Sequence, residues 1–524
     1  MNSRPWTRFY PPKALEPLEL AFGRLSELPP YAANTFGDAP ALTLDDHVWS
    51  FRQLNQAAER FAAKLSECGV GPGARVAILL PNLPEYVAAL FGTWVAGGTV
   101  VQVNPAYVAP EIDRILEHSG SRALVTNSEQ IAKLKEGGIA LGLTTFEARD
   151  GDLLQVGSPA GEPYDARTSF PDASSELALL QYTGGTTGLP KSVMLTHQNV
   201  LSNIEQRLRV TLGAMDVPPG ASVVNTLPMC HVYGLTCVTL SSVQIGMNQL
   251  IVPRFHARSV LELIRSARPF VFHGVPTMYA AFLREPDLEA FGLESVQVFN
   301  SAGAPMPPAH WQQFRARTTA QVLSGFGITE ASPSTHTYPS YIPRRKGSSG
   351  IPIPYTDVRV VRHDGDVVAD VPKGEVGEML IKGPQVMKGY WNDSAATDET
   401  LKDGWLHTGD LVRVDEDGYL FVVGRQKDVI VASGYNVYPA EIERVIGAMP
   451  TVAEVAVVGM AHEYRGETIK AVVVPLPGAN VFPDDVVAQC RKELAPFKVP
   501  THVEIIDALP RTPVGKIDKR ALAG

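Results

Sequence analysis

The chain has few cysteines and little net charge for its 524 residues. Its four cysteines form no CxxC pair, which excludes a disulfide framework and indicates a reducing compartment. The net charge is −9, from 46 basic and 55 acidic side chains, which argues against a protein that neutralises nucleic-acid phosphates. The hydrophobic share of 45% is too high for a disordered chain. We therefore expect a folded cytoplasmic protein of two or more domains, without a nucleic-acid partner.

The chain also lacks a long uninterrupted apolar run. Its N-terminal segment has neither the apolar core nor the small-residue cleavage site of a signal peptide. Residues 217–253 contain no Asp, Glu, Lys or Arg, but prolines, glycines and polar residues interrupt this stretch. We expect a buried segment of sheet and helix there, and no transmembrane helix.

The N-terminal segment mixes basic and aromatic residues, as a membrane-surface contact does. These residues are Arg4, Trp6, Arg8, Phe9, Tyr10 and Lys13. We favour a terminal arm that lies on the body of the protein. A peripheral contact with the inner membrane face is the alternative.

Several common catalytic motifs are missing. Pro190 stands where a P-loop needs glycine, and Glu330 stands where GxGxxG needs its last glycine. The segment 462–466 lacks the second histidine of HExxH, and GxSxG does not occur. P-loop, dinucleotide-binding, zinc-protease and α/β-hydrolase interpretations are therefore excluded.

Short β-branched runs alternate with longer amphipathic ones between about residues 40 and 320. This alternation predicts βαβ units and parallel sheets covered by helices. After about residue 345, short strands joined by turn signals predict a small antiparallel β subdomain, and mixed α/β patterns return after residue 424. The expected fold is α/β: a large domain over 1–424, with two α/β subdomains and the β subdomain, followed by a small α+β domain over 425–524.

A loop rich in glycine and threonine follows the apolar strand predicted at 177–183. It contains Thr183, Gly184, Gly185, Thr186, Thr187, Gly188 and Lys191. Backbone N–H groups of such a loop can surround phosphate oxygens, while hydroxyls add donors and the lysine adds charge. A flexible polar turn is the alternative, and it explains this density of glycine, threonine and lysine less well.

The loop resembles the phosphate-binding motif of the adenylate-forming superfamily, which includes acyl-CoA synthetases, luciferases and peptide-synthetase adenylation domains. Other motifs of that superfamily follow in its order, at 228–234, 301–306, 325–330, 404–410, 424–443 and 510–519. The segments 4–11, 383–391 and 433–439 most resemble bacterial long-chain fatty acyl-CoA synthetases. Two departures are Ser192, where glycine is usual, and Phe326, where tyrosine is common.

The resemblance implies a two-step reaction with ATP, Mg²⁺ and coenzyme A. A small-molecule carboxylic acid attacks ATP to form acyl-AMP and pyrophosphate, and the CoA thiolate then displaces AMP. Glu330 and Thr183 are the implied magnesium ligands. Lys516, His231 and Thr187 are the implied catalytic residues, with Lys516 placed between the carboxylate and the α-phosphate.

The same resemblance assigns residues to the nucleotide. Asp410 would accept hydrogen bonds from the ribose, and Arg425 would add a donor to ribose or phosphate. Adenine would lie between two short segments, with Phe326 stacking on the ring. These segments are Gly303, Ala304 and Pro305, and Gly325, Phe326, Gly327 and Thr329.

The acyl pocket is expected around His231, Tyr233, Gly234 and Cys237. The segment after His231 has no charged residue, so a medium- or long-chain fatty acid is the expected substrate. An aryl acid of the 4-coumarate type and a non-catalytic acyl-AMP or lipid-binding protein are the alternatives.

The C-terminal domain is expected to be mobile and to serve both steps. Ser433, Gly434 and Tyr435 resemble the family's loop on the CoA side. Lys427 matches the family's hinge residue, about which the domain would turn.

Overall fold

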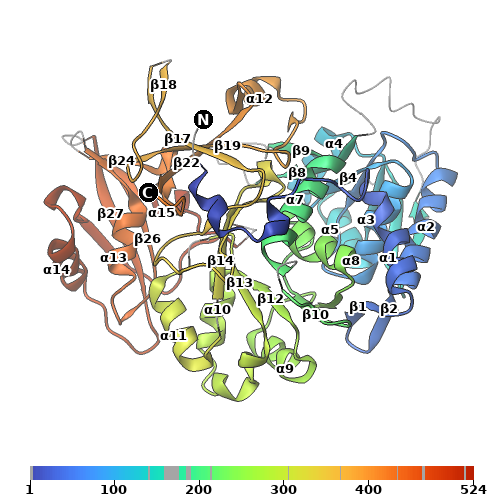
Figure 1. Cartoon of the computed structure of the whole chain (residues 1–524), viewed down its shortest axis with the longest axis horizontal. Coiled ribbons are helices and arrows are strands. Elements are labelled where there is room, and N and C mark those ends of the chain that lie inside the picture. Colours follow the sequence, from blue (N-terminus) through green and yellow to red (C-terminus); the bar gives the residue numbers. More distant parts are fainter. Residues whose placement is uncertain are drawn as a thin grey trace.

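The computed structural model describes residues 4–139, 142–157, 176–183, 191–212, 215–304, 306–320, 322–365, 367–432, 435–462, 466–512 and 515–523. Its elements form two large sheets covered by helices, a smaller antiparallel sheet and a C-terminal α+β unit, which confirms the expected fold class. In Figure 1 the C-terminal unit, in red, lies beside the antiparallel sheet and away from the first helices.

One large sheet has the order β20-β9-β8-β4-β3-β5-β6-β7. Its strands are β3 Arg75–Ile78, β4 Thr99–Gln102, β5 Ala123–Thr126, β6 Thr144–Arg149, β7 Asp152–Gly157, β8 Leu177–Tyr182, β9 Ser192–Thr196 and β20 Gly389–Tyr390. The pairs β3–β4, β3–β5, β4–β8 and β5–β6 are parallel. The helices between them are α3 Pro84–Val95, α4 Ala109–Ser119 and α5 Ser128–Glu136. These are the βαβ units that the sequence predicts.

The second large sheet has the order β16-β15-β14-β13-β12-β10-β11-β1-β2. Its strands are β1 Pro40–Leu44, β2 His47–Ser50, β10 Ser222–Asn225, β11 Asn248–Ile251, β12 Val271–Gly274, β13 Val298–Ser301, β14 Val322–Gly327, β15 Ser334–Thr337 and β16 Ile351–Pro352. Its helices include α1 Leu28–Phe36, α2 Phe51–Glu67, α7 His197–Val210, α8 Ser241–Ile245, α9 Ala257–Ala267, α10 Pro276–Leu283 and α11 Pro308–Thr318.

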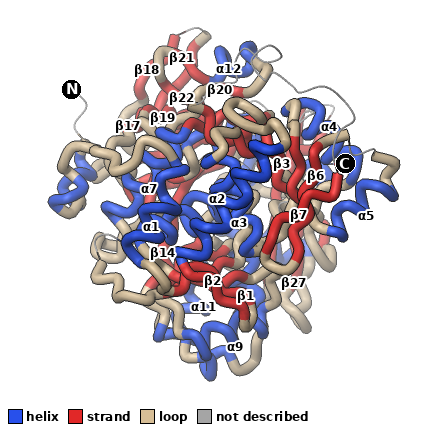
Figure 2. The backbone as a smooth tube through the Cα atoms, turned by 90° about the vertical axis from the view of Figure 1, so that its right-hand side faces the viewer, coloured by secondary structure: helices blue, strands red, loops and turns tan. Residues whose placement is uncertain are grey.

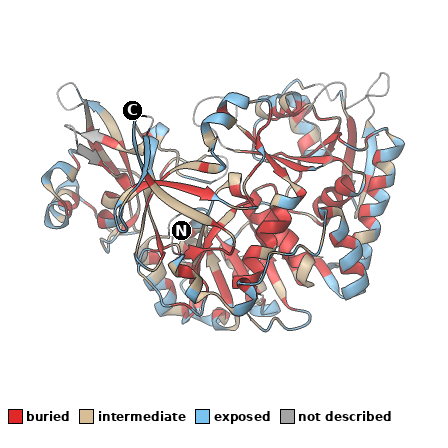
Figure 3. Cartoon of the chain, turned by 45° about the horizontal axis from the view of Figure 1, so that its top comes forward, coloured by how far each residue is buried: buried red, intermediate tan, exposed pale blue. Residues whose placement is uncertain are grey.

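The helices α1, α2 and α3 lie side by side between the two large sheets (Figure 2). Ser50 caps α2 by accepting the backbone N–H of Gln53. Helix α3 is buried on almost all sides, and a Cβ on its Gly92 would lie 2.8 Å from the Ala58 carbonyl oxygen of α2. Glycine therefore allows these two helices to pack closely. Figure 3 shows how the buried residues concentrate in the strands and in helices near the middle of the molecule.

The charge-free stretch folds as the sequence predicts. It contains β10, a π-helix η5 at Tyr233–Leu240, α8 and β11, and η5 is buried throughout. Within the described ranges, no helix is both long and apolar enough to cross a membrane.

The antiparallel sheet has the order β18-β17-β19-β22-β21, with β23 also pairing with β22. Its strands are β17 Asp357–Asp364, β18 Val367–Asp370, β19 Val376–Lys382, β21 Leu401–Lys402, β22 Trp405–Val414 and β23 Leu420–Arg425, and α12 Ser394–Thr400 precedes β21. The C-terminal unit follows with β24 Ile430–Ala432, β25 Tyr435–Val437, α13 Pro439–Ile446, β26 Val452–His462, β27 Gly466–Pro475, α14 Pro483–Glu493, β28 His502–Ile505 and α15 Arg520–Ala523. This unit has apolar clusters of its own, including Ile442, Val457 and Val473.

The N-terminal segment lies on the body of the protein. Trp6 is 8% exposed and packs in a cluster with Tyr338, Ile351 and Tyr419. Arg4 donates two hydrogen bonds of 2.8 Å to the carboxylate of Asp357. These aromatic and basic groups thus have partners within the chain, as the favoured interpretation requires.

Replacing Trp6 with Ala tests this attachment. We expect a loss of about 3 kcal/mol of stability, because a large buried ring leaves a cavity that its neighbours fill only in part. A thermal melt should show a lower midpoint, and trypsin should cut faster after Arg8. Leu15→Ala is the matched control, because Leu15 is 57% exposed. Equal behaviour of the two variants would contradict the packing of Trp6.

Candidate active site

A buried carboxylate lies on the antiparallel sheet, where β22 and β23 pair Asp410 with Arg425. Arg425 Nε donates to Asp410 Oδ1 over 2.7 Å, and Asp410 is 3% exposed. Its second oxygen, Oδ2, is buried and has no hydrogen-bond partner among the described residues. Burial raises the pKa of Asp410 to about 6, although the charge of Arg425 opposes the shift. An unpaired buried acceptor of this kind fits a hydroxyl donor such as that of a ribose.

Glu330 lies in the turn that follows β14, at Thr329–Ala331. The hydroxyl of Tyr390 donates to its Oε1 over 2.9 Å. The negative charge of Glu330 adds to burial in raising the pKa of Asp410. Two carboxylates thus act on one another across this region, an arrangement that favours cations nearby.

Tyr390 contacts two of the predicted site residues, although it is not itself one of the residues predicted from the sequence. It comes from β20, at the edge of the first large sheet, and the Nζ of Lys191 lies 4.7 Å from the centre of its ring. Tyr390 therefore joins the lysine of the glycine-rich loop to Glu330. The segment 383–391, which contains Tyr390, resembles long-chain fatty acyl-CoA synthetases, but that resemblance does not indicate a role for the tyrosine.

The two ends of the glycine-rich loop are joined at their base. The backbone N–H of Thr183 donates to the Lys191 carbonyl over 2.9 Å, and its hydroxyl donates to the same oxygen over 3.2 Å. Some predicted site residues lie outside the described residues: Gly184, Gly185, Thr186, Thr187, Gly188, Pro305, Ser433 and Gly434.

Lys516 lies in a tight turn closed by a hydrogen bond of 2.7 Å from the Thr512 N–H to the Lys516 carbonyl. Lys516 as a whole residue is exposed. The protein around its ammonium group nevertheless removes water from that group, and this desolvation lowers the pKa of Lys516. Arg425 lowers this pKa further, while Glu330 and Asp410 act in the opposite direction. The structure therefore brings Lys516 within electrostatic reach of residues that precede it by about a hundred positions or more.

The charge of Lys516 also affects the pKa of His231. Burial first, and then the charge of Lys516, lowers the pKa of His231 to about 4, so the imidazole is neutral at pH 7. The backbone N–H of Tyr233 donates to His231 Nδ1 over 3.2 Å. That bond assigns the proton of the neutral ring to Nε2, which makes this nitrogen a hydrogen-bond donor.

Three of the predicted acyl-pocket residues, Tyr233, Gly234 and Cys237, belong to the π-helix η5, and His231 precedes it by two positions. Tyr233 Oη lies 3.2 Å from His273 Nδ1, and Cys237 Sγ lies 3.3 Å from Ser334 Oγ. A Cβ on Gly234 would lie 2.4 Å from the Pro228 carbonyl oxygen, so this position accepts only glycine without a backbone shift.

Helix α7 brings a buried cation, Arg207, against the charge-free segment. Arg207 is 4% exposed and donates to the Cys237 carbonyl and to Ser241 Oγ, the latter over 3.2 Å. Its Nε has no hydrogen-bond partner in the described part of the chain. No local pattern identifies Arg207, because it lies on α7, outside the charge-free segment that follows His231.

Arg207 lines a narrow cavity of about 20 Å³, which is room for one water molecule. His273 and Asn300 line it too, together with apolar side chains such as Val271 and Leu323. Burial and the charge of Arg207 lower the pKa of His273 well below its usual value. The cavity therefore combines apolar walls with a neutral imidazole, an amide and a guanidinium.

The predicted adenine segments lie at the ends of neighbouring strands. Gly303 and Ala304 are exposed and follow β13, and Gly303 has a φ of +83°. Phe326 is half-buried on β14, and its ring centre lies 6.1 Å from that of His336. Parallel strands β12, β13 and β14 end at one edge of the sheet, where α/β proteins commonly bind ligands.

Lys427 and Tyr435 lie in the connection to the C-terminal unit. Lys427 is in the turn Gln426–Asp428, between β23 of the antiparallel sheet and β24 of the C-terminal sheet. Burial is the main cause that lowers its pKa. Tyr435 begins β25, which pairs with β24.

Two family models match the chain. Residues 30–391 match the model of the AMP-binding enzymes, and residues 441–516 match that of the AMP-binding enzyme C-terminal domain. A long-chain-fatty-acid–CoA ligase from Bacillus subtilis (strain 168) is 34% identical over 99% of this chain and 98% of its own length. A feruloyl-CoA synthase from an Amycolatopsis species is 36% identical over 95% of this chain and 96% of its own.

Solved structures share the fold over nearly the whole chain. The crystal structure of ATP-bound MatB from Rhodopseudomonas palustris has a TM-score of 0.82 and 30% identity, covering 95% of this chain and 98% of that one.

The raised pKa of Asp410 predicts a pH dependence for nucleoside binding. Below a pKa of about 6 the carboxylate gains a proton and loses acceptor capacity, so adenosine should bind roughly tenfold more weakly at pH 5 than at pH 7. Adenosine is the chosen probe because it carries no phosphate to titrate in that range. Equilibrium dialysis would measure both affinities.

Two controls accompany this measurement. Asp410→Asn should bind adenosine weakly with little change between pH 5 and 7, and 2′-deoxyadenosine should depend less on pH in the original protein. The pKa of Asp410 in the folded protein lies above the unfolded value of about 3.9. Ionisation of Asp410 should therefore lower the stability of the ligand-free protein as the pH rises from about 4 to 6. A flat adenosine profile would contradict the buried carboxylate's role.

Proposed function

Because the chain belongs to the AMP-binding enzyme family, we propose that it is an ATP-dependent acid–CoA ligase acting on medium- or long-chain fatty acids. One observation carries the proposal: the charge of Lys516 acts on the pKa of Asp410 and on that of His231, which supports a shared site for the lysine, the carboxylate and the histidine. Relatives named long-chain-fatty-acid–CoA ligase support the choice of acid.

In the first step the acid carboxylate attacks the α-phosphorus of ATP. Lys516 donates hydrogen bonds to the carboxylate and α-phosphate oxygens as negative charge accumulates there. Its lowered pKa follows mainly from desolvation, which also strengthens such interactions. His231 positions the acid through its Nε2–H, and because its pKa is about 4 it does so as a neutral donor.

Asp410 and Glu330 have separate roles toward ATP. Asp410 Oδ2, the buried acceptor without a partner among the described residues, receives a ribose hydroxyl, and Arg425 keeps Oδ1 in place. Tyr390 binds Glu330 Oε1, which leaves Oε2 for a cation. Magnesium held by Glu330 and the Thr183 hydroxyl would neutralise charge on the departing pyrophosphate.

In the second step the CoA thiolate attacks the acyl carbon and AMP leaves. We assign residues 425–524 to a domain that turns between the steps, with Lys427 as the hinge. The connection Gln426–Asp428 supports this, because it joins two different sheets through a single short turn. This rotation of the domain would move Lys516 away from the reaction centre and bring the loop of Ser433, Gly434 and Tyr435 to it.

Lys516→Ala should separate the two half-reactions. We expect pyrophosphate release from ATP and acid to fall on the order of 10²- to 10³-fold, the usual loss when one charge-stabilising donor is removed. Supplied acyl-AMP and CoA should still give thioester at close to the original rate. Lys492→Ala, at an exposed lysine of α14, is the matched control.

Gly434→Leu should have the reverse effect, because a side chain would fill the path of the pantetheine arm while acyl-AMP still forms. Equal loss of both half-reactions in both variants, with folding verified by circular dichroism, would exclude the two-conformation scheme. Absence of pyrophosphate release with every acid tested would instead favour a non-catalytic acyl-AMP or lipid-binding protein.

An aryl-acid CoA ligase is the second candidate, and the polar lining of the narrow cavity favours it. A phenolic hydroxyl is about the size of the one water molecule for which this cavity has room, and Arg207, His273 and Asn300 can bind it better than a methyl end. The similarity to a feruloyl-CoA synthase supports the same acid class. A comparison of CoA thioester formation with octanoate, palmitate and coumarate decides between the two candidates.

Arg207→Met should change this selectivity. We expect the ratio of kcat/KM for octanoate to that for coumarate to rise about tenfold, because the variant removes a polar partner and adds apolar surface. Arg207→Lys, which keeps a cation in the helix, is the control and should shift the ratio less. An unchanged ratio in Arg207→Met would place Arg207 outside the acyl pocket.

A further inference from the structure

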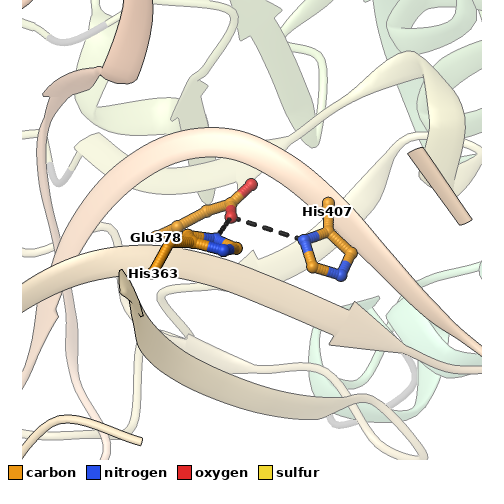
Figure 4. A group of neighbouring side chains, drawn as sticks. All are labelled: His363, Glu378 and His407. Carbon is orange, nitrogen blue, oxygen red and sulfur yellow. Dashed lines mark hydrogen bonds and ion pairs between the residues drawn. The ribbon is translucent and has the colours of Figure 1, made fainter. Parts of the chain in front are cut away.

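Three potential metal ligands meet on the antiparallel sheet, apart from the site described above. They are His363 of β17, Glu378 of β19 and His407 of β22 (Figure 4). Glu378 Oε2 lies 2.5 Å from His363 Nε2 and 3.4 Å from His407 Nδ1. The three ligand atoms lie within 4.8 Å of one another.

The strand register explains why these side chains share a face. Val361 pairs with Glu378, and His363 lies two residues further along β17, on the same face as Val361. On the other side of β19, Leu380 pairs with His407, and Leu380 shares the face of Glu378. Backbone pairing therefore holds the three ligands together on neighbouring strands, independently of flexible loops.

The donor set suits zinc. Two imidazole nitrogens and one carboxylate oxygen are a known protein ligand set for Zn²⁺, with water as the fourth ligand. Bonds of about 2.0–2.1 Å in a tetrahedron separate the ligand atoms by roughly 3.3 Å. The observed separations lie on both sides of this value, so small side-chain rotations bring all three atoms to bonding distance.

The surroundings also suit a bound ion. The backbone N–H of Gly409 donates to Glu378 Oε1 over 2.9 Å and orients the carboxylate, as outer partners of metal ligands do. The side chains of Glu378 and His407 are 6% and 13% exposed, whereas that of His363 is 33% exposed. The site is thus enclosed on two sides and open to solvent at His363, where an ion and its water ligand can enter.

We propose that His363, Glu378 and His407 form a zinc site. The ion links β17, β19 and β22, and through the Glu378–Gly409 hydrogen bond it stabilises the backbone next to Asp410. This site is separate from the magnesium ligands assigned to Glu330 and Thr183, and its role is structural. A hydrogen-bonded triad that never takes up metal is the competing interpretation.

Zinc titration of the untagged, metal-free full-length protein tests the proposal. The titration uses a chromogenic chelator as competitor, without magnesium or nucleotide. We expect one equivalent of Zn²⁺ to bind, and His363→Ala to weaken that binding at least tenfold. The double variant His47→Ala/His256→Ala is the matched control, because it removes two exposed histidines elsewhere and should bind zinc as the original protein does.

Cobalt adds a second measurement. Co²⁺ in place of zinc should give the visible absorption of a tetrahedral site, and both His363→Ala and His407→Gln should lose it while their melts in EDTA match the original protein. No zinc binding by the original protein, or undiminished binding by His363→Ala, would overturn the proposal. Equal weakening by the control variant would overturn it as well.

Discussion

A buried carboxylate surrounded by charges from distant segments is the constraint on which the site depends. Asp410 is almost fully buried, and desolvation is the main cause that raises its pKa to about 6. Arg425 and Lys516 favour its ionised form, while Glu330 opposes it. Cations from both the antiparallel sheet and the C-terminal segment therefore favour the ionised carboxylate, which is the form that accepts hydrogen bonds.

The antiparallel sheet has a central part in this arrangement. Its strand β22 carries both His407 and Asp410, and the pairing of β22 with β19 is shifted near the residues that oppose Gly409. Gly409 has a φ of +66°, a conformation that glycine adopts without strain, and its N–H binds Glu378. The proposed ribose-binding carboxylate, Asp410, and one of the proposed zinc ligands, His407, thus share strand β22, so order at the zinc ligands affects the backbone next to Asp410.

The sequence predicted the fold well where local patterns are strong. The alternation predicted between about residues 40 and 320 is present in β3, α3, β4, α4 and β5, and the strand predicted at 177–183 is β8, because β-branched runs and amphipathic spacing are local properties. The motif residues Glu330, Asp410 and Lys516 could be singled out because each lies in a run of consecutive residues that resembles a motif of the family. Tyr390 and Arg207 could not, because each acts on partners that no local pattern identifies.

The sequence by itself determined the family and the order of α/β and β units, and it identified the residues proposed to carry the chemistry, since these depend on local patterns and on motifs of a few consecutive residues. Only the tertiary structure decided which polar and charged side chains contact one another. The cation of α7 lies against η5, Tyr390 bonds Glu330, and His363 joins Glu378 and His407. Such contacts follow from strand register and helix packing, which place residues far apart in the chain within a few ångströms, and no local sequence pattern records that distance.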